Sequence, residues 1–160
     1  MKIDIKTPSD CNYYEITLFL NLVKEGSQVN EIGLRKRILG SKLLGFCYFD
    51  NELVGVSTIK NPIISYRNRT FKRGNIEGDA TKFKYELGYS VTKKGYQGKG
   101  INYKLNNKLI SNICDGNIYA TTGNPRMVYL LEKLDFKPIG EKYKGEYNDE
   151  LQIYSFMGIM

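Results

Sequence analysis

Residues 82–113 read KFKYELGYSVTKKGYQGKGINYKLNNKLISNI, and three patterns follow one another in this stretch. Apolar and aromatic residues alternate with others over 82–92, which predicts a long strand. Residues 93–100 contain three glycines and break that alternation. Apolar residues then recur at the spacing of a helix face, at Ile101, Leu105, Leu109 and Ile113. The stretch therefore predicts a strand, a glycine-rich loop and a helix in succession.

Such a loop suits the binding of phosphate groups. Its backbone N–H groups point outward, and the positive end of the helix dipole lies behind them. Gly98 and Gly100 have no side chains to block a ligand, and Lys99 adds positive charge. Loops of this composition also occur as ordinary turns. The loop does not match G-x-G-x-x-G, and the sequence contains no G-K-[ST] motif.

The rest of the chain predicts alternating strands and helices. An N-terminal strand over 1–6 leads to a helix that ends at Gly26. The other expected elements are a basic helix over 27–40, a hairpin of strands 42–49 and 53–60, a mobile basic loop over 62–78, a strand over 118–122, a helix capped by Asn124, and strands over 136–143 and 150–157 with a turn at Asn148-Asp149.

This order of elements resembles that of the GNAT superfamily of N-acetyltransferases. The family motif [Q/R]-x-x-G-x-[G/A] follows its fourth strand, and residues 97–102, QGKGIN, match it at Gln97 and Gly100. Asn102 departs from the small final residue. Asn124 and the segment LEKLDF, 131–136, resemble the family's Asn and its Tyr-Glu-Lys-Leu-Gly-Phe segment. The resemblance is specific in the C-terminal half and rests on element order in the N-terminal half.

The resemblance implies an α/β (α+β) fold in one domain, residues 1–160. It implies a mixed, mostly antiparallel sheet of about six or seven strands, flanked by about four helices, with a splay between strands four and five. It also implies acetyl-CoA as co-substrate and no metal. The cofactor would be bound by Val91 and Thr92 on the fourth strand, by Asn124, and by the loop residues Gln97, Gly98, Lys99, Gly100, Ile101 and Asn102.

The implied reaction is direct attack of a primary amine on the thioester, so a base and a proton donor are needed. Glu86 lies 11 residues before Gln97, where the family often has a carboxylate base. Its alternative role is that of an exposed strand glutamate. The family's usual tyrosine falls on Leu131, and Tyr129 is about 200° away around the helix. Tyr143 is therefore the candidate acid, with Tyr147 or solvent as alternatives.

Composition limits the function classes. The chain contains no histidine, which excludes histidine-based triads and histidine-ligated zinc. Its three cysteines are widely separated, which predicts buried thiols rather than disulfides. Apolar runs are shorter than a membrane span, and the N-terminus resembles a strand rather than a secretion signal, so a cytoplasmic protein is expected.

The acceptor is left open by the sequence. The formal charge of +7 allows a nucleic-acid-modifying enzyme of the same fold, with basic residues 67–73 on phosphates. Leu131 allows a catalytically degenerate CoA-binding or interaction module. The leading expectation for the acceptor is an amine on a small molecule, peptide or protein. Pairing of the final strands between two subunits would also allow a homodimer.

Overall fold

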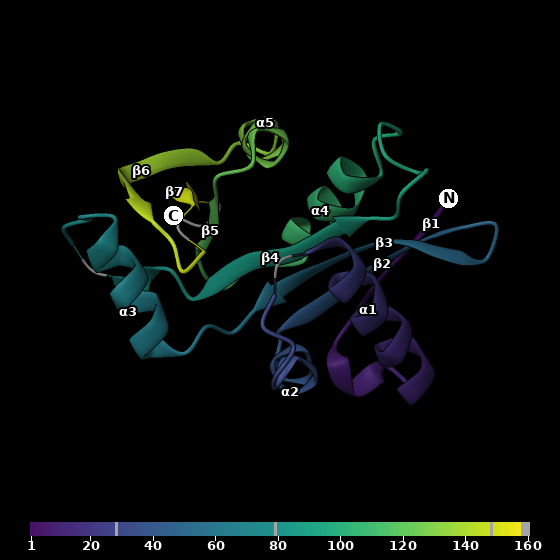
Figure 1. The fold of residues 1–160 in the computed structure, drawn as a ribbon. Helices are drawn as coiled ribbons and strands as arrows, with labels where there is room; N and C mark the ends of the chain where they lie inside the picture. The colour runs from purple at the N-terminus through teal and green to yellow at the C-terminus, as the bar shows by residue number, and fades with distance from the viewer. Residues whose placement is uncertain (28, 79, 148, 158–160) are drawn as a thin grey trace. The chain divides into compact units, whose positions relative to one another are not determined.

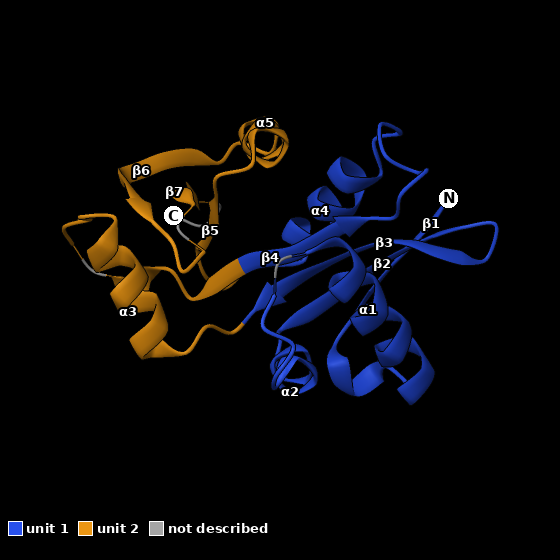
Figure 2. Ribbon diagram, in the orientation of Figure 1, with its two compact units in different colours: residues 1–60, 87–113 blue, residues 61–86, 114–160 orange. Residues whose placement is uncertain are grey.

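The computed structural model describes residues 1–27, 29–78, 80–147 and 149–157. The chain divides into two compact units, residues 1–60 with 87–113, and residues 61–86 with 114–160 (Figure 2). We call them unit 1 and unit 2. The strand β4, Tyr85–Thr92, contributes to both, because the division falls between Glu86 and Leu87.

Unit 1 is a sheet with helices on both faces (Figure 1). Its core clusters explain the layers, because apolar residues of the central strands point alternately to the two faces. One face packs against α1 and α2, and the other against α4. The elements are β1 (Lys2–Lys6), α1 (Tyr13–Gly26), α2 (Leu34–Leu39), β2 (Leu43–Phe49), β3 (Glu52–Lys60), the second part of β4, and α4 (Ile101–Ser111).

Antiparallel pairing joins β1 to β2 and β2 to β3. The β2–β3 turn has Asp50 and Asn51 at φ 49° and 65°, and these residue types tolerate the left-handed conformation that a two-residue hairpin loop needs. The predicted hairpin is therefore confirmed.

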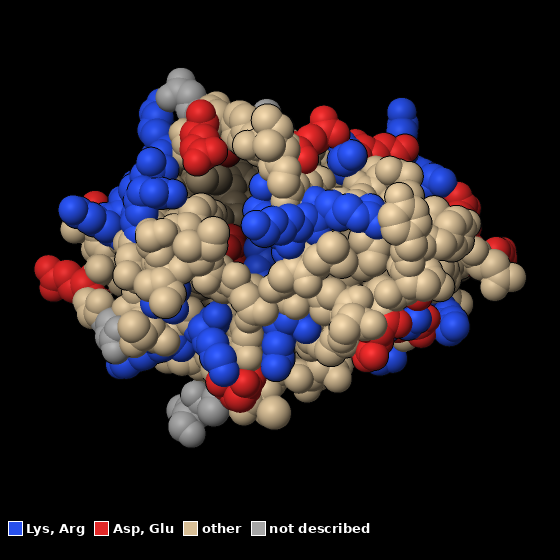
Figure 3. Space-filling model, turned by 90° about the horizontal axis from the view of Figure 1, so that it is seen from below, with Lys and Arg blue, Asp and Glu red and all other residues tan. Residues whose placement is uncertain are grey.

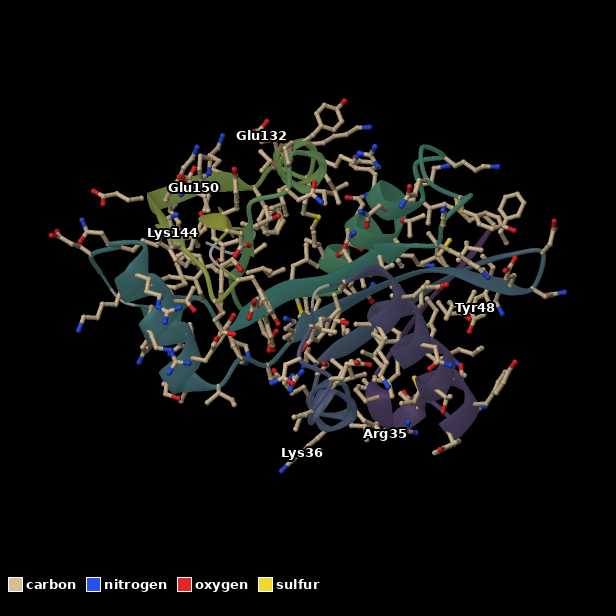
Figure 4. All side chains as sticks on the ribbon, viewed as in Figure 1. Arg35, Lys36, Tyr48, Glu132, Lys144 and Glu150 are labelled. Atoms are coloured by element: carbon tan, nitrogen blue, oxygen red, sulfur yellow. The ribbon has the colours of Figure 1, made fainter. Side chains whose placement is uncertain are left out.

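Unit 2 contains the remaining strands. Its core is built from Phe71, Phe83, Tyr119 and Ile153. β5 pairs with β7, and β7 pairs with β6, both antiparallel; Lys144 and Glu150, labelled in Figure 4, are one such pair. The elements are α3 (Ile64–Arg73), the start of β4, β5 (Ile118–Thr122), α5 (Pro125–Lys133), β6 (Lys137–Lys144) and β7 (Glu150–Phe156).

The strand order is β1-β2-β3-β4-β5-β7-β6. β4 and β5 are parallel, and their pairing consists of Tyr85 with Ile118 and Glu86 with Tyr119. The rest of β4 lies beyond this short register, as expected for a splay between the fourth and fifth strands. The predicted fold class is confirmed.

Residues 62–78 were predicted to form a mobile basic loop, and this is wrong. Residues Ile64–Arg73 form the helix α3, and Arg67, Thr70 and Phe71 occupy its buried face at helical spacing. The first turn has no side-chain cap, because Ile63 occupies the N-cap position. The sequence therefore has no capping residue at this position to mark the start of the helix.

The helix predicted over 27–40 is shorter than expected. α2 begins at Leu34, because Gly33 has φ 73° and breaks the helical path before it. Ile32, which lies within the predicted helix but before the start of α2, is 84% exposed. Figure 4 shows the side chain of Lys36 extending away from α2, as expected for the basic face. Gln28 and Asn148, included in the predicted helix and final turn, lie outside the described residues.

The prediction of buried thiols holds for Cys47, but Cys114 is exposed and Cys11 is half-buried. Cys114 follows the end of α4 and lies in the connection to β5, where its side chain is exposed. Among the described residues, no helix is long and apolar enough to cross a bilayer.

Candidate functional site

A buried carboxylate lies in the core of unit 2. Glu86 is 4% exposed and pairs in register with Tyr119 of the neighbouring strand β5. The Tyr119 hydroxyl donates a hydrogen bond to Glu86 Oε2 at 3.2 Å. The Tyr119 ring itself contacts Phe71 edge-on, with 5.1 Å between ring centroids. Glu86 is therefore a buried, oriented acid group rather than an exposed strand glutamate.

Three tyrosine hydroxyls experience the charge of this carboxylate. Burial, and then the charge of Glu86, raise the pKa of Tyr143 to about 12. The same two causes, in the same order, raise the pKa of Tyr119 well above its usual range. The pKa of Tyr66 on α3 is also raised, and here the charge of Glu86 is the larger cause and burial the second. All three phenols therefore stay neutral even above the ordinary tyrosine pKa near 10, and each can donate a hydrogen bond.

Tyr143 extends this cluster to the strand β6. It is half-buried against the core formed by Phe71, Phe83, Tyr119 and Ile153. A side-chain hydrogen bond with Thr121 of β5 partly offsets the rise in its pKa. The structure therefore brings together the two residues that the sequence singled out for catalysis, Glu86 and Tyr143, with Tyr66 and Tyr119 added.

Arg67 lies beside the same cluster. It is 7% exposed, its Nη1 donates to the carbonyl of Phe83 at 3.4 Å, and its charge acts on Tyr119. The guanidinium of Arg67 is therefore buried and hydrogen-bonded in the interior of unit 2. Arg67 is thus not exposed for contact with nucleic-acid phosphates, whereas other basic residues of the same helix are exposed, namely Arg69, Lys72 and Arg73.

The glycine-rich loop of unit 1 precedes α4. Gly95, Gly98 and Gly100 have φ values of 94°, 79° and 76°, a region that side chains other than glycine rarely adopt. No atom lies within 4 Å of the position where a Cβ would stand at any of the three. Gly100 is the N-cap of α4 and offers no side chain to its first N–H groups. The loop thus presents backbone donors at an open helix N-terminus.

The end of the β2–β3 hairpin braces this loop. The Tyr96 hydroxyl donates to Glu52 Oε2 at 2.8 Å, and Lys93 forms an ion pair with the same carboxylate. The Lys99 ammonium lies 5.7 Å from the ring centroid of Phe49 and 5.8 Å from that of Tyr96. The charge of Lys99 is therefore placed at the loop by two aromatic rings.

β4 is irregular between Glu86 and the loop. Tyr89 has φ 51°, which a regular strand does not contain, so the strict alternation expected over 82–92 is interrupted. The Lys60 ammonium lies 3.9 Å from the centroid of the Tyr89 ring, and Arg37 Nε donates to the Tyr89 hydroxyl at 3.2 Å. The Val91 side chain is buried directly against Gly26. Val91 therefore has only its backbone to offer a ligand.

Solved structures share this arrangement of strands and helices. An acyl-CoA N-acyltransferase from Pseudomonas aeruginosa superposes with a TM-score of 0.70 at 15% identity, over 96% of this chain and 97% of that one. A GNAT-family acetyltransferase from Streptococcus agalactiae gives 0.67 at 16% identity, over 96% and 94%. The chain has the fold of the GNAT acetyltransferases. No protein-family model and no curated protein match it in sequence.

A third GNAT-fold structure, Arabidopsis thaliana NAA60, was solved in complex with acetyl-CoA. It superposes with a TM-score of 0.66 at 14% identity, over 97% of this chain and 98% of that one. At identities this low, coverage this complete shows that the chains share a fold.

The helix α5 shows how this chain departs from the GNAT motif. Asn124 caps α5, and its Oδ1 accepts from the Arg126 N–H at 2.9 Å. Leu131, at the position of the family's tyrosine, has no exposed surface, whereas Tyr129 is 70% exposed. Tyr147 is 53% exposed and lies outside the core cluster of Tyr143. The role of Asn124 toward pantetheine stays a prediction.

Proposed function

We propose that this chain is an acetyl-CoA-dependent N-acetyltransferase that transfers the acetyl group directly to a primary amine. The observation that carries the proposal is Glu86, a carboxylate buried among neutral tyrosine hydroxyls in a chain with the GNAT fold. A buried, hydrogen-bonded carboxylate is the type of group that removes a proton from an amine. A primary ammonium has a pKa near 10.4 in water, so it needs such a base before it can act as a nucleophile.

The loop in unit 1 fits a diphosphate. Three glycines with positive φ leave open space over the backbone, no side chain caps α4, and Lys99 contributes a positive charge. In the proposal Gln97, Gly98, Lys99, Gly100, Ile101 and Asn102 hold the pyrophosphate of CoA. Val91 and Thr92 align its pantetheine arm through backbone groups, and Asn124 contacts the same arm. Acetyl-CoA, when bound, supplies a thioester carbonyl that is open to attack by an amine.

The residues of this chain then have separate tasks. Glu86 accepts a proton from the acceptor ammonium, directly or through one water molecule. A backbone N–H near Val91 donates a hydrogen bond to the carbonyl oxygen, where negative charge develops. Tyr143 donates a hydrogen bond to the departing sulfur. The C–N bond forms as the C–S bond breaks, and a proton from the amine finally reaches the thiolate.

The nucleic-acid alternative loses Arg67, which is buried, and keeps the exposed residues Arg69, Lys72 and Arg73 of the helix α3. On the face drawn in Figure 3, Lys and Arg side chains form separate groups with Asp and Glu among them. Backbone binding to nucleic acid favours a continuous basic surface instead. We therefore propose a small-molecule, peptide or protein amine as the acceptor, in the cytoplasm.

The replacement Glu86→Gln tests the proposed base. It keeps the shape of the side chain and removes the proton-accepting carboxylate, so we expect acetyl transfer to slow by about 100-fold or more. The affinity for CoA should stay nearly unchanged. The measurement is thiol release from acetyl-CoA with a panel of primary amines, together with calorimetric titration of CoA.

Glu132→Gln is the matched control, because Glu132 is an exposed residue of α5 whose side chain points away from the helix (Figure 4). It should leave the rate unchanged. An unchanged rate in Glu86→Gln would remove Glu86 from the mechanism. Wild-type protein that binds CoA but releases no thiol with any amine would support the degenerate binding module instead.

A further inference from the structure

A chain of polar side chains is buried under the first turn of α4. Ser57 on β3 and Asn106 on α4 have no exposed surface, and Ser90 of β4 joins them. Ser57 Oγ lies 2.6 Å from Ser90 Oγ and donates to Asn106 Oδ1 at 2.6 Å. Asn106 Nδ2 donates to the carbonyl and to Oδ1 of Asn102, at 2.8 and 2.6 Å. The chain of contacts thus leads from the sheet to Asn102, the second residue of α4 and the last residue of the loop motif.

Only one orientation of the Asn106 amide satisfies these contacts. The Asn102 carbonyl can only accept a hydrogen bond, so the group that faces it must be Nδ2. Asn106 Oδ1 then points to the serine hydroxyls, which have protons to donate. Since Nδ2 of Asn106 also faces the side chain of Asn102, the atom that meets it there must be Oδ1. The orientation of each amide follows from that of its neighbour.

This orientation determines what Asn102 can offer a ligand. Its oxygen is engaged by Asn106, so the group that remains is the Nδ2 amine, a donor. Asn102 is half-buried at the N-terminus of α4, directly after the three glycines. The GNAT motif has glycine or alanine at this position, and such a residue offers no side-chain donor.

We propose that Asn102 donates a side-chain hydrogen bond from Nδ2 to the pyrophosphate of CoA, and that Asn106 is the positioning residue that orients it. The inference rests on the proposed function and adds a side-chain donor to the backbone donors of the loop. A donor fixed before the ligand arrives loses little conformational entropy on binding. Asn102, in place of the family's glycine or alanine, then adds a contact to the pyrophosphate.

Two replacements of Asn102 separate contact from stability. Asn102→Asp keeps an oxygen for Asn106 and places a carboxylate at a helix N-terminus, where negative charge stabilises the fold. It also replaces the proposed donor by a charge that repels phosphate. Calorimetric titration should show CoA bound at least tenfold more weakly by Asn102→Ala, and more weakly still by Asn102→Asp. Pantetheine, which lacks the pyrophosphate, should bind all three proteins equally.

Asn106→Leu tests the positioning role, because it removes the partner that orients Asn102 and leaves Asn102 itself in place. It should weaken the binding of CoA but not that of pantetheine. In a double-mutant comparison, Asn102→Ala should change the affinity for CoA much less in the Asn106→Leu protein than in the wild type. Asn107→Ala is the matched control on the same helix, since Asn107 is exposed, and its CoA affinity should equal that of the wild type.

The results distinguish this inference from the function on which it rests. If the wild type binds CoA and Asn102→Asp binds it with the same affinity, the inference is overturned and the proposed function is not. Wild-type protein that binds neither CoA nor inorganic pyrophosphate would overturn both. Binding of pyrophosphate without CoA would reject the cofactor, and the Asn102 variants titrated with pyrophosphate would then decide the inference.

Discussion

Tyr143 holds its proton more tightly than an ordinary tyrosine, and this limits what it can do in catalysis. Burial and the nearby Glu86 charge raise its pKa to about 12. A thiol has a pKa near 8.5, so transfer of the Tyr143 proton to a thiolate is uphill by roughly three to four pKa units. We therefore assign Tyr143 to hydrogen-bond donation, and the thiolate takes its proton from the amine by way of Glu86 or solvent.

Replacing Tyr143 by Phe should lower kcat about tenfold, through loss of one hydrogen bond to a developing charge. The wild-type rate should show no alkaline decline due to this tyrosine below about pH 11, because its raised pKa keeps the phenol protonated there. The folded state favours the neutral phenol of Tyr143, because its pKa is raised above the unfolded value. This preference is lost as the pH rises through the folded pKa.

Rate profiles of wild-type and Tyr143→Phe protein, with ultraviolet titration of phenolate, check both points. Tyr147→Phe is the control, since Tyr147 is exposed, and it should keep the wild-type rate. A rate decline near pH 9 that disappears in Tyr143→Phe would contradict the assignment and restore Tyr143 as an acid.

At the level of single elements, α1 shows how a helix end contributes to stability. Asn12 Oδ1 accepts from the Glu15 N–H at 2.8 Å, and Glu15 Oε1 accepts from the Asn12 N–H at 3.0 Å, which together form a capping box. Lys6 of β1 also donates to Glu15, and this bond is the main cause of the lowered pKa of Glu15, followed by the Asn12 N–H. One carboxylate thus ties the first strand to the first helix.

Asn12→Ala should cost about 1 kcal/mol of the free energy of unfolding at neutral pH, through loss of the cap. Glu15→Gln should be destabilising as well, and its difference from wild type should shrink as the pH falls below 4.5, the ordinary pKa of Glu15. A lowered folded-state pKa gives stability above the unfolded value, and acid removes it.

Urea unfolding at pH 7 and at a series of acidic pH values measures these differences. Glu25→Gln is the control, because Glu25 is exposed at the other end of α1. A Glu15→Gln difference that stays constant with pH would show that the carboxylate charge does not stabilise this helix end.

Elements with strong local signals were predictable from the sequence, and the others were not. Asn124-Pro125 marks the start of α5 by capping chemistry, and the structure begins that helix at Pro125. α3 has no such signal, because Ile63 stands at its N-cap and basic side chains conceal its narrow buried face. Its burial depends on Phe83 and Tyr119, partners distant in sequence, so local patterns could not reveal it.

The candidate site shows the same division. Glu86 was singled out because it lies 11 residues before Gln97, where the family resemblance implies a carboxylate, and its role as the base stays a prediction. Tyr66 and Tyr119 were missed, since only the parallel pairing of β4 with β5 and the packing of α3 bring them to Glu86. The amide orientation of Asn102 was also hidden, because it depends on Ser57, 45 residues earlier in the chain.

For the whole molecule, the proposed cofactor should act as a stabilising ligand. A ligand that binds only the folded state raises the free energy of unfolding by about 2.7 kcal/mol at a concentration 100 times its Kd. For a chain of 160 residues this corresponds to a rise in Tm of roughly 5–10 °C. Acetyl-CoA and CoA should both produce it, since the proposed contacts are to the part that they share.

Gly100→Glu should abolish that rise in Tm. It places a negative side chain where the pyrophosphate is expected, and it forces a residue other than glycine into φ 76°. Because that strain also lowers Tm without ligand, Gly78→Glu is the matched control: Gly78 has φ 112°, lies in unit 2 and has no atom near its Cβ position. It should have a lowered Tm but keep the shift with CoA. Equal shifts in wild type, Gly100→Glu and Gly78→Glu, measured by thermal unfolding, would mean that the glycine loop is only a turn and that CoA, if it stabilises the protein, binds elsewhere.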